Sequence, residues 1–273
     1  MTEGLVSIIT PIYNSGRYIS RAIESVLSQT YRNWEMIITD DCSTDDGPEI
    51  VESYAKSDSR IKLFRLDHNG GPGKARNNSI MQSQGQYIAF LDSDDCWFPE
   101  KLERQLALMA EKKCAIVYSS YYFCDEENEI KGIVKCKERV RYWRMVCDNA
   151  IGFLTLMYDR KVTGDELMPT IRKRQDWGLN IRLLKKCKVA YGIIDPLAVY
   201  KIRYNSVSRD KLGLIKYNIA IYRDVVNMPM PLSVLMFIFV FIPFYVGRKF
   251  LNLLKNITFR KPKEIPELKF SKV

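Results

Sequence analysis

Three carboxylates fall within four positions at Asp92-Ser93-Asp94-Asp95, directly after the apolar residues Ala89-Phe90-Leu91. Carboxylates this close repel one another, and the repulsion raises their pKa values unless a cation relieves it. Mg²⁺ binds one or two protein carboxylates together with phosphate oxygens, and Mn²⁺ prefers the same kind of ligand. The spacing therefore favours a clamp for a metal-bound nucleotide diphosphate. The alternative is an acidic turn in which Asp94 or Asp95 caps the helix expected after Pro99.

A second acidic pair, Asp40-Asp41, ends another apolar run and precedes Cys42-Ser43-Thr44-Asp45. A carboxylate at this place can accept hydrogen bonds from a nucleotide base or from ribose hydroxyls. The same residues also fit a cap for the following helix, with Ser43 or Thr44 ahead of Asp45 and Asp46. The two interpretations are compatible, because one side chain can cap the helix while its neighbour binds a ligand.

Glycines and cations lie together at Gly70-Gly71-Pro72-Gly73, which is followed by Lys74 and Arg76. Flexible backbone and positive charge at a helix start favour anions. The segment lacks both the Lys-Ser/Thr ending of a P-loop and the glycine spacing of a dinucleotide site, so the motif alone is weak evidence.

Alternating elements position these clusters. Apolar runs at 5–10, 35–39, 61–66 and 87–91 predict buried strands, and helical spacing predicts helices at about 18–28, 46–57 and 73–84. Such alternation is typical of parallel βαβ units in an open, doubly wound α/β sheet. Ligands of these sheets bind beyond the C-terminal ends of the strands, where the polar clusters fall.

The second half of the chain is less regular. It predicts strands at 115–122 and 130–134, a helix beginning near Asp176, and extended segments at 190–194 and 198–204. The basic stretch 135–144 is interpreted as a solvated face, with contact to lipid phosphate as the alternative.

The net charge of +10 is concentrated in the tail of this 273-residue chain. Residues 211–273 carry eleven Lys or Arg against three Asp or Glu, whereas residues 1–210 carry 31 against 29. Residues 232–247 contain no charge but are interrupted by Pro243, and a straight bilayer span needs roughly 20 apolar residues. We therefore expect a monotopic or re-entrant membrane element, with a true span or a core helix as alternatives. This pattern suits an anionic membrane surface better than nucleic acid.

The seven cysteines are scattered without a CxxC pair or a zinc-like spacing. They predict reduced thiols in a cytosolic compartment, and the first residues show no secretory pattern.

Five motifs, taken in order, resemble glycosyltransferase family 2. They are Val6–Thr10 with Pro11 and Tyr13-Asn14; Ser25–Tyr31; Asp40–Asp45; Ala75-Arg76-Asn77 with Gly85–Asp95; and Trp97-x-Pro99-x-Lys101-Leu102. The match is dense over residues 5–106 and resumes at Arg174-Gln175-Asp176-Trp177. Within the family, the chain is similar to transferases that build bacterial surface polysaccharides of the teichuronic-acid type.

The resemblance implies a GT-A fold, an inverting mechanism and a nucleoside-diphosphate sugar donor, for which UDP is the expected nucleotide. It implies Mn²⁺ or Mg²⁺ at Asp92 and Asp94. The implied nucleotide-binding residues are Pro11, Tyr13, Asn14, Asp41, Arg76, Asp92, Ser93 and Arg203. For Arg203 a surface strand with solvated cations is the alternative to diphosphate contact.

The family commonly carries Glu-Asp at the base position, and Gln175-Asp176 keeps the aspartate here. The resemblance therefore implies Asp176 as the catalytic base, with a simple helix-start aspartate as the alternative. Inversion requires a carboxylate about 3 Å from the acceptor hydroxyl, and a metal that stabilises the departing diphosphate. A second departure is Cys42, which replaces the usual glycine and questions whether that turn is as tight.

We predict a GT-A domain at 1–210, with a nucleotide-binding half at 1–106 and an acceptor half at 107–210, followed by a helical membrane-association segment at 211–273. The expected reaction transfers a sugar to a membrane-associated acceptor, a polyprenyl-diphosphate-linked glycan, at the cytoplasmic face of the cell membrane. Residues 231–256 are expected to meet that membrane. The alternatives are a nucleotidyltransferase, which the segment Pro11–Ser15 does not favour, and a non-catalytic sugar-nucleotide-binding scaffold.

Overall fold

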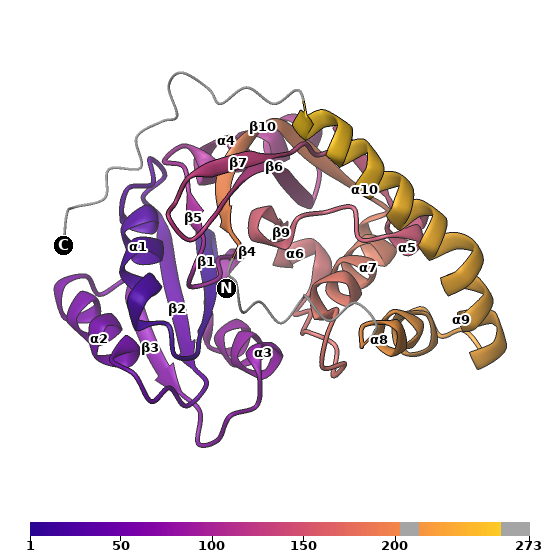
Figure 1. Cartoon of the computed structure of the whole chain (residues 1–273). Coiled ribbons are helices and arrows are strands. Elements are labelled where there is room, and N and C mark those ends of the chain that lie inside the picture. The colour runs from indigo at the N-terminus through magenta and orange to yellow at the C-terminus, as the bar shows by residue number, and fades with distance from the viewer. Residues whose placement is uncertain (203–212, 258–273) are drawn as a thin grey trace.

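The computed structural model describes residues 1–202 and 213–257, with the side chain of Lys255 left out. A single sheet runs through the molecule in the order β3-β2-β1-β4-β9-β6-β10-β5, with β7 paired to β6 and β8 paired to β10 (Figure 1). The strands are β1 (Thr2–Ile12), β2 (Trp34–Asp40), β3 (Ile61–Arg65), β4 (Gly85–Phe90), β5 (Cys96–Trp97), β6 (Ile116–Cys124), β7 (Ile130–Val134), β8 (Arg139–Arg141), β9 (Met157–Asp159) and β10 (Val189–Lys201).

Helices cover both faces of the sheet. They are α1 (Gly16–Leu27), α2 (Gly47–Ser57), α3 (Pro72–Gln82), α4 (Lys101–Lys112), α5 (Tyr142–Cys147), α6 (Arg160–Thr163), α7 (Gln175–Cys187), α8 (Ile215–Ala220), α9 (Met230–Met236) and α10 (Ile242–Ile257). Among the described residues, a 3₁₀ turn at Phe153–Thr155 and π-helical turns at Ile221–Val225 and Phe237–Phe241 are found as well.

The predicted parallel half is confirmed. β1 pairs in parallel with β2 and β4, and β2 pairs in parallel with β3. The strand order therefore runs outward from β1 through β2 to β3 and then returns, so that β4 lies on the other side of β1. Neighbouring residues of β1 serve opposite layers, because side chains alternate along a strand. Ile8 packs with Ile19 and Leu102 in one apolar cluster, whereas Ile9 packs with Ile80 and Trp177 in the other.

The second half departs from simple alternation. β9 lies antiparallel between β4 and β6, which together with β10 continue the parallel direction. The two extended segments expected at 190–194 and 198–204 belong to one strand, β10, as far as Lys201. The sheet is therefore mixed but mainly parallel, as in a GT-A domain.

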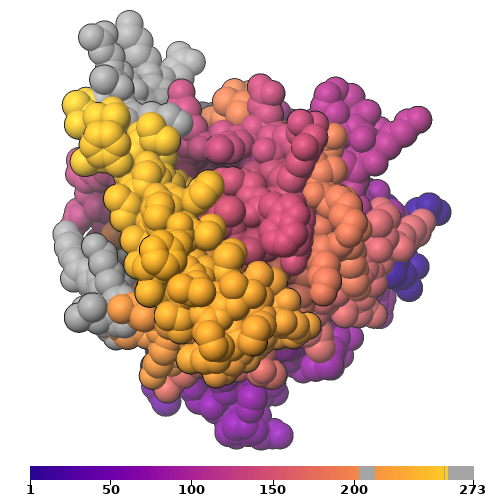
Figure 2. Space-filling view, turned by 90° about the vertical axis from the view of Figure 1, so that its right-hand side faces the viewer, coloured from indigo at the N-terminus to yellow at the C-terminus, as the bar shows by residue number. Residues whose placement is uncertain are grey.

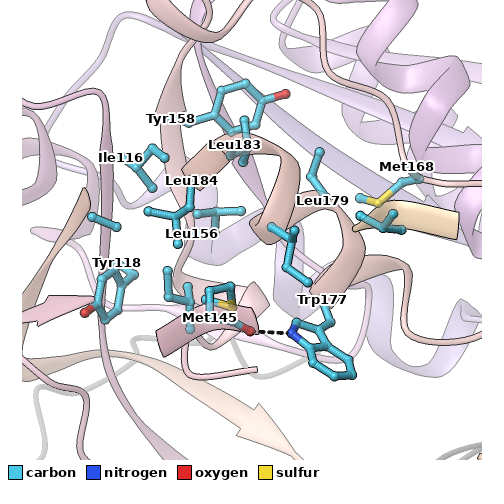
Figure 3. Packing of buried hydrophobic residues seen from close by; sticks show 14 of the residues in the cluster. Ile116, Tyr118, Met145, Leu156, Tyr158, Met168, Trp177, Leu179, Leu183 and Leu184 are labelled. Carbon is cyan, nitrogen blue, oxygen red and sulfur yellow. Dashed lines mark hydrogen bonds between the residues drawn. The ribbon is translucent and has the colours of Figure 1, made fainter. Parts of the chain in front are cut away.

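Helix α7 is fixed by its apolar face. Trp177 is fully buried, and its Nε1 donates to the Met145 carbonyl at 2.7 Å, with Leu179, Leu183 and Leu184 packed beyond it (Figure 3). Because Asp176 precedes Trp177 directly, this packing also fixes the start of the helix that carries Asp176.

Pro243, which interrupts the apolar run of the tail, does not break its helix. Residues 230–254 form one continuous helix of 25 residues. In the most apolar window of this helix, 17% is buried inside the protein. A π turn directly precedes Pro243, and the Ile242 amide donates to the Phe237 carbonyl. The wider turn accommodates a residue that has no N–H and would otherwise break an α-helix. By length and composition alone, this helix is apolar enough to cross a membrane.

The tail is also part of the packed domain. Ile221 and Tyr222 are fully buried against the cluster that contains Trp177, and Phe237 and Phe241 join it. The domain boundary expected at residue 210 stays a prediction.

Candidate active site

The turns that follow β1, β2 and β4 meet at one edge of the sheet. Ser93 Oγ lies 2.9 Å from Ser15 Oγ, which joins the turn after β4 to the turn after β1. Asn14 Oδ1 accepts from the Thr44 amide at 2.8 Å, which joins the turns after β1 and β2. The polar clusters predicted from the sequence therefore form one region, at the switch point where such sheets bind ligands.

Asp41 anchors the glycine-rich loop. Its two carboxylate oxygens accept from the backbone amides of Gly70 at 2.7 Å and Gly71 at 2.8 Å, and the side chain is buried. The nucleotide contact expected of Asp41 stays a prediction. The observed bonds give it a second role, because they hold the loop that leads into α3.

The turn at Cys42 has a glycine-like conformation. Cys42 has φ = 64°, in the left-handed region, and its Sγ donates to the Leu66 carbonyl at 3.0 Å. The turn is therefore as tight as one made with glycine, at the cost of strain in a residue that carries a Cβ. Asp40 Oδ1 accepts from the Ser43 amide at 3.0 Å. Asp45 bridges the starts of α1 and α2 through the Gly16 and Gly47 amides.

The acidic loop after β4 is held from two sides. Arg76 Nη2 donates to Asp92 Oδ1 at 2.5 Å, and the guanidinium lies over the Phe153 ring. Asp95 is buried and accepts from the Lys201 backbone amide at 2.9 Å. The capping alternative for this loop is wrong, because Glu100 occupies the N-cap of α4 and makes no side-chain cap bond.

The loop carries surplus negative charge. Burial, together with the neighbouring Asp94 and Asp92, raises the pKa of Asp95 well above its usual range. Burial and the same carboxylates raise the pKa of Tyr200, so its hydroxyl stays protonated beside them. Carboxylates gathered in this way fit a divalent cation. Among the residues that the structure describes, no three His, Cys, Asp or Glu form a complete metal cluster, so phosphate oxygens would have to supply further ligands.

Asp176 lies in the first turn of α7, as predicted. Its Oδ2 accepts from Asn149 Nδ2 at 2.7 Å, and Asn149 Oδ1 accepts from Asn180 Nδ2 at 3.2 Å. Arg174, directly before the helix, has φ = 69°, which is strained for a residue other than glycine.

One cavity of about 930 Å³ joins the two halves of the site. Arg76, Asp92 and Asp95 line it on the nucleotide side, and Asp176 lines it together with Asn149. Tyr121 also lines the cavity. Burial raises its pKa to about 12; Arg248 lowers it, and Asp95 and Asp176 add smaller increases. Asp94 does not line the cavity but belongs to the same turn as Asp92 and Asp95.

The glycine-rich loop approaches the base position. A Cβ on Gly73 would lie 2.1 Å from the side-chain amide of Gln175, the residue before Asp176. The glycine therefore leaves room for Gln175 at the mouth of the cavity.

The cavity also has a basic wall that the sequence did not assign to a site. Its cations are Lys135, Lys137, Arg144, Arg172, Lys173, Arg174 and Arg248. The first three come from the stretch interpreted as a solvated face; Lys135 and Lys137 are exposed, as that interpretation expects, and they also line the cavity, whereas Arg144 is half-buried. The density of Lys and Arg at 135–144 was the feature of the sequence that could have indicated this wall. Arg248 belongs to the apolar tail helix, and no feature of the sequence around it indicated a place in the site.

The remaining predicted residues are distributed as follows. Pro11 is buried in β1, and the Tyr13 side chain at the following turn is 51% exposed. Asn14 has φ = 47° and ties two turns together. Arg203 lies outside the described residues.

Known proteins share both the sequence and the fold. The chain is 42% identical over 222 residues to the Bacillus subtilis glycosyltransferase TuaG, named for teichuronic acid biosynthesis, covering 81% of this chain and 88% of that protein. It is 34% identical over 233 residues to WfgD of Escherichia coli, covering 84% and 90%. WfgD is named a UDP-Glc:alpha-D-GlcNAc-diphosphoundecaprenol beta-1,3-glucosyltransferase.

Two solved structures have the same fold at lower identity. S. aureus TarS with UDP-GlcNAc superposes with a TM-score of 0.67 at 22% identity, covering 90% of this chain and 72% of that one. A Pyrobaculum calidifontis mannosyltransferase with GDP-Man and Mn²⁺ superposes with a TM-score of 0.64 at 15% identity, covering 92% and 72%. The model of the family described as glycosyl transferase family 2 matches residues 7–163. The chain belongs to glycosyl transferase family 2.

Proposed function

We propose that this glycosyltransferase moves a sugar, with inversion, from a UDP-sugar to a polyprenyl-diphosphate-linked glycan in the synthesis of a bacterial surface polysaccharide. The observation that carries the proposal is the single cavity that contains both the acidic loop at Asp92 and Asp95 and the carboxylate of Asp176. A transferase needs its leaving-group site and its base within reach of one reacting carbon, and a cavity shared by the two supports such an arrangement.

The donor is expected at the β1–β4 edge of the sheet. Tyr13 is exposed beside the turn network of Asn14 and Thr44, where a flat base can lie, and Asp41 and Arg76 would complete the nucleotide site. Asp92 and Asp94 would hold Mn²⁺ or Mg²⁺, which would neutralise charge on the departing diphosphate. Ser93 is tied to Ser15 and fixes the loop. Arg203 remains a further candidate for the diphosphate.

Asp176 is the proposed catalytic base. The carboxylate would take the proton of the acceptor hydroxyl as that oxygen attacks the anomeric carbon from the side opposite the diphosphate. The hydrogen bond from Asn149 orients the carboxylate. Tyr121, protonated at neutral pH, lines the same cavity.

The relatives support the choice of substrates. The name of WfgD gives UDP-glucose as donor and a GlcNAc-diphospholipid as acceptor, and the same words name a second E. coli relative, WfaP, which is 36% identical over 207 residues. The name of TuaG points to a cell-surface polymer. We infer the same class of donor and acceptor for this chain.

We propose that the helix at 230–257 lies in the plane of the membrane surface on its cytoplasmic side. Its outer stripe is apolar and exposed, with Phe239, Val246, Phe250, Leu253 and Ile257 at helical spacing. Figure 2 shows this helix on the surface of the molecule. The opposite face is docked over its length.

Two contacts, one near the middle of the helix and one at its C-terminal end, carry the argument for this orientation. Phe241 stacks against Trp177 at 5.1 Å, and Asn256 Oδ1 accepts from the Ile133 amide. A bilayer span would draw these docked polar elements into hydrocarbon, which is costly.

The test is transfer from UDP-[¹⁴C]glucose to a synthetic GlcNAc-diphosphate lipid by the full chain, with a panel of other UDP-sugars in parallel. We expect a labelled lipid product whose new linkage is β by NMR, and loss of product when EDTA removes the metal. An α linkage would refute inversion. Release of pyrophosphate from a nucleoside triphosphate, or binding without turnover of any UDP-sugar, would refute the transferase assignment.

A further inference from the structure

Helix α10 supplies one strip of the cavity wall. Phe244, Gly247, Arg248 and Leu251 all line the cavity, and their spacing of three and four residues places them on one side of the helix. A single cation thus lies between two apolar side chains, on a helix whose outer face is exposed and apolar. This arrangement is complementary to an amphiphile that has an anionic head group and an apolar chain.

The cation is held in place by a buried acid. Arg248 Nε and Nη2 both donate to the Asp148 carboxylate, the latter at 3.0 Å, and the Asp148 side chain is 1% exposed. Arg144 reaches the same carboxylate from α5, at 3.7 Å. Two guanidinium groups therefore share one negative charge, which leaves a surplus positive charge at the cavity wall.

The held guanidinium still has donors to offer. An arginine carries five N–H groups, and the side-on pair with Asp148 uses only two of them. Bidentate or multiple N–H donation is the usual way in which proteins recognise phosphate oxygens. Lys135 and Lys137 line the same cavity and are exposed, so they add to its positive potential.

We propose that Arg248, with Arg144, forms the binding site for the diphosphate of the lipid-linked acceptor, distinct from the donor diphosphate site at the Asp92–Asp95 loop. The lipid chain would leave the site along Phe244 and Leu251 toward the exposed face of α10. This inference rests on the proposed function and names the residues that would select a diphosphate lipid over a free glycan.

Gly247 provides an independent steric probe of this route. A Cβ at Gly247 would meet no atom within 4 Å, so a larger side chain there extends into open space on the cavity side of α10. Gly247→Leu would therefore obstruct the proposed lipid path without a clash inside the protein, and Gly247→Ala is its small control.

The experiment measures binding of farnesyl diphosphate to the full, detergent-solubilised chain by calorimetry, with UDP and Mg²⁺ saturating the donor site. Arg248→Gln should weaken binding roughly tenfold to hundredfold, which is the weight of a hydrogen bond to a charged group. Lys249→Gln removes the same charge from the next residue, which is exposed and lies outside the cavity, and should change affinity less than about twofold, as expected for a screened surface charge. Gly247→Leu should weaken binding comparably to Arg248→Gln, and Gly247→Ala should not.

Equal affinities in Arg248→Gln and Lys249→Gln would overturn the proposal, as would full binding by Gly247→Leu. If Arg248→Gln loses affinity only for phosphatidylglycerol vesicles and not for farnesyl diphosphate, Arg248 binds membrane headgroups. The proposed acceptor site is then refuted. UDP affinity and the melting temperature of each variant show whether the fold is intact. Failure of the wild-type chain to turn over any UDP-sugar would instead reject the proposed function, so the two failures are distinguishable.

Discussion

Substitution of Asp176 by asparagine isolates the proton-accepting role of this side chain from its structural role. The new amide oxygen can accept the Asn149 Nδ2 bond that Asp176 Oδ2 accepts at 2.7 Å, and the buried Trp177 keeps the start of α7 fixed. The substitution therefore removes the base while it leaves the shape of the cavity. A positioned general base contributes about 10²- to 10⁴-fold to rate. We expect kcat to fall by that factor, which corresponds to about 3–5 kcal/mol in the activation barrier.

The assay measures kcat for transfer to the GlcNAc-diphosphate lipid together with the dissociation constant of UDP. The matched control is Asp195→Asn on β10, because the Asp195 side chain is 68% exposed and pairs with Arg104 at the surface. The control should keep kcat within about twofold, since exposed ion pairs contribute little. If Asp176→Asn binds UDP normally and retains kcat within threefold of the wild type, Asp176 is not the base.

Three further substitutions test other parts of the molecule. Asp94→Ala should abolish the dependence of turnover on Mn²⁺ or Mg²⁺ and lower kcat/KM at least a hundredfold, as for loss of a charge-stabilising group; unaltered metal dependence in a metal titration would remove Asp94 as a ligand. Cys42→Gly should leave the free energy of unfolding unchanged or raise it by up to about 1 kcal/mol, because glycine adopts the φ of 64° without strain. A clear loss of stability in urea denaturation would mean that the contacts of the Cys42 thiol outweigh the relief of backbone strain. Burial holds the pKa of Lys101 well below its usual 10.5, so the unfolded chain binds more protons there and stability should rise as the pH increases toward that value. Lys101→Met should flatten this rise in denaturation curves recorded between pH 7 and 9, and an unchanged slope would contradict the assignment to Lys101.

The sequence predicted the elements whose patterns are local. β7 was expected at the bounds it has, and β1–β4 with α1–α3 differ from expectation only at their ends. Continuous apolar runs and helical spacing are properties of short windows, and the polar turns at Asn14, Asp41 and Asp92 follow directly from where the strands stop. The acidic loop and Asp176 could therefore be named before the structure, and Asp92, Asp95 and Asp176 line one cavity.

The features that the sequence did not predict depend on distant pairings. β9 has only three residues, too few for any period, and its place between β4 and β6 follows from contacts far apart in the chain. The continuity of the tail helix through Pro243 could not be predicted either, because the π turn before the proline depends on how the helix packs on the domain. In the sequence, Arg248 is one of several cations of the tail. In the structure, Asp148, one hundred residues earlier, holds it in the cavity wall.

A structure of the full chain with a UDP-sugar and Mn²⁺, with the metal located from its anomalous signal, tests the central claim most directly. The account predicts Mn²⁺ bound between Asp94 and the donor diphosphate, with the anomeric carbon exposed toward Asp176 across the 930 Å³ cavity. A metal bound away from the Asp92–Asp95 loop, or a donor whose anomeric carbon faces away from Asp176, would contradict it.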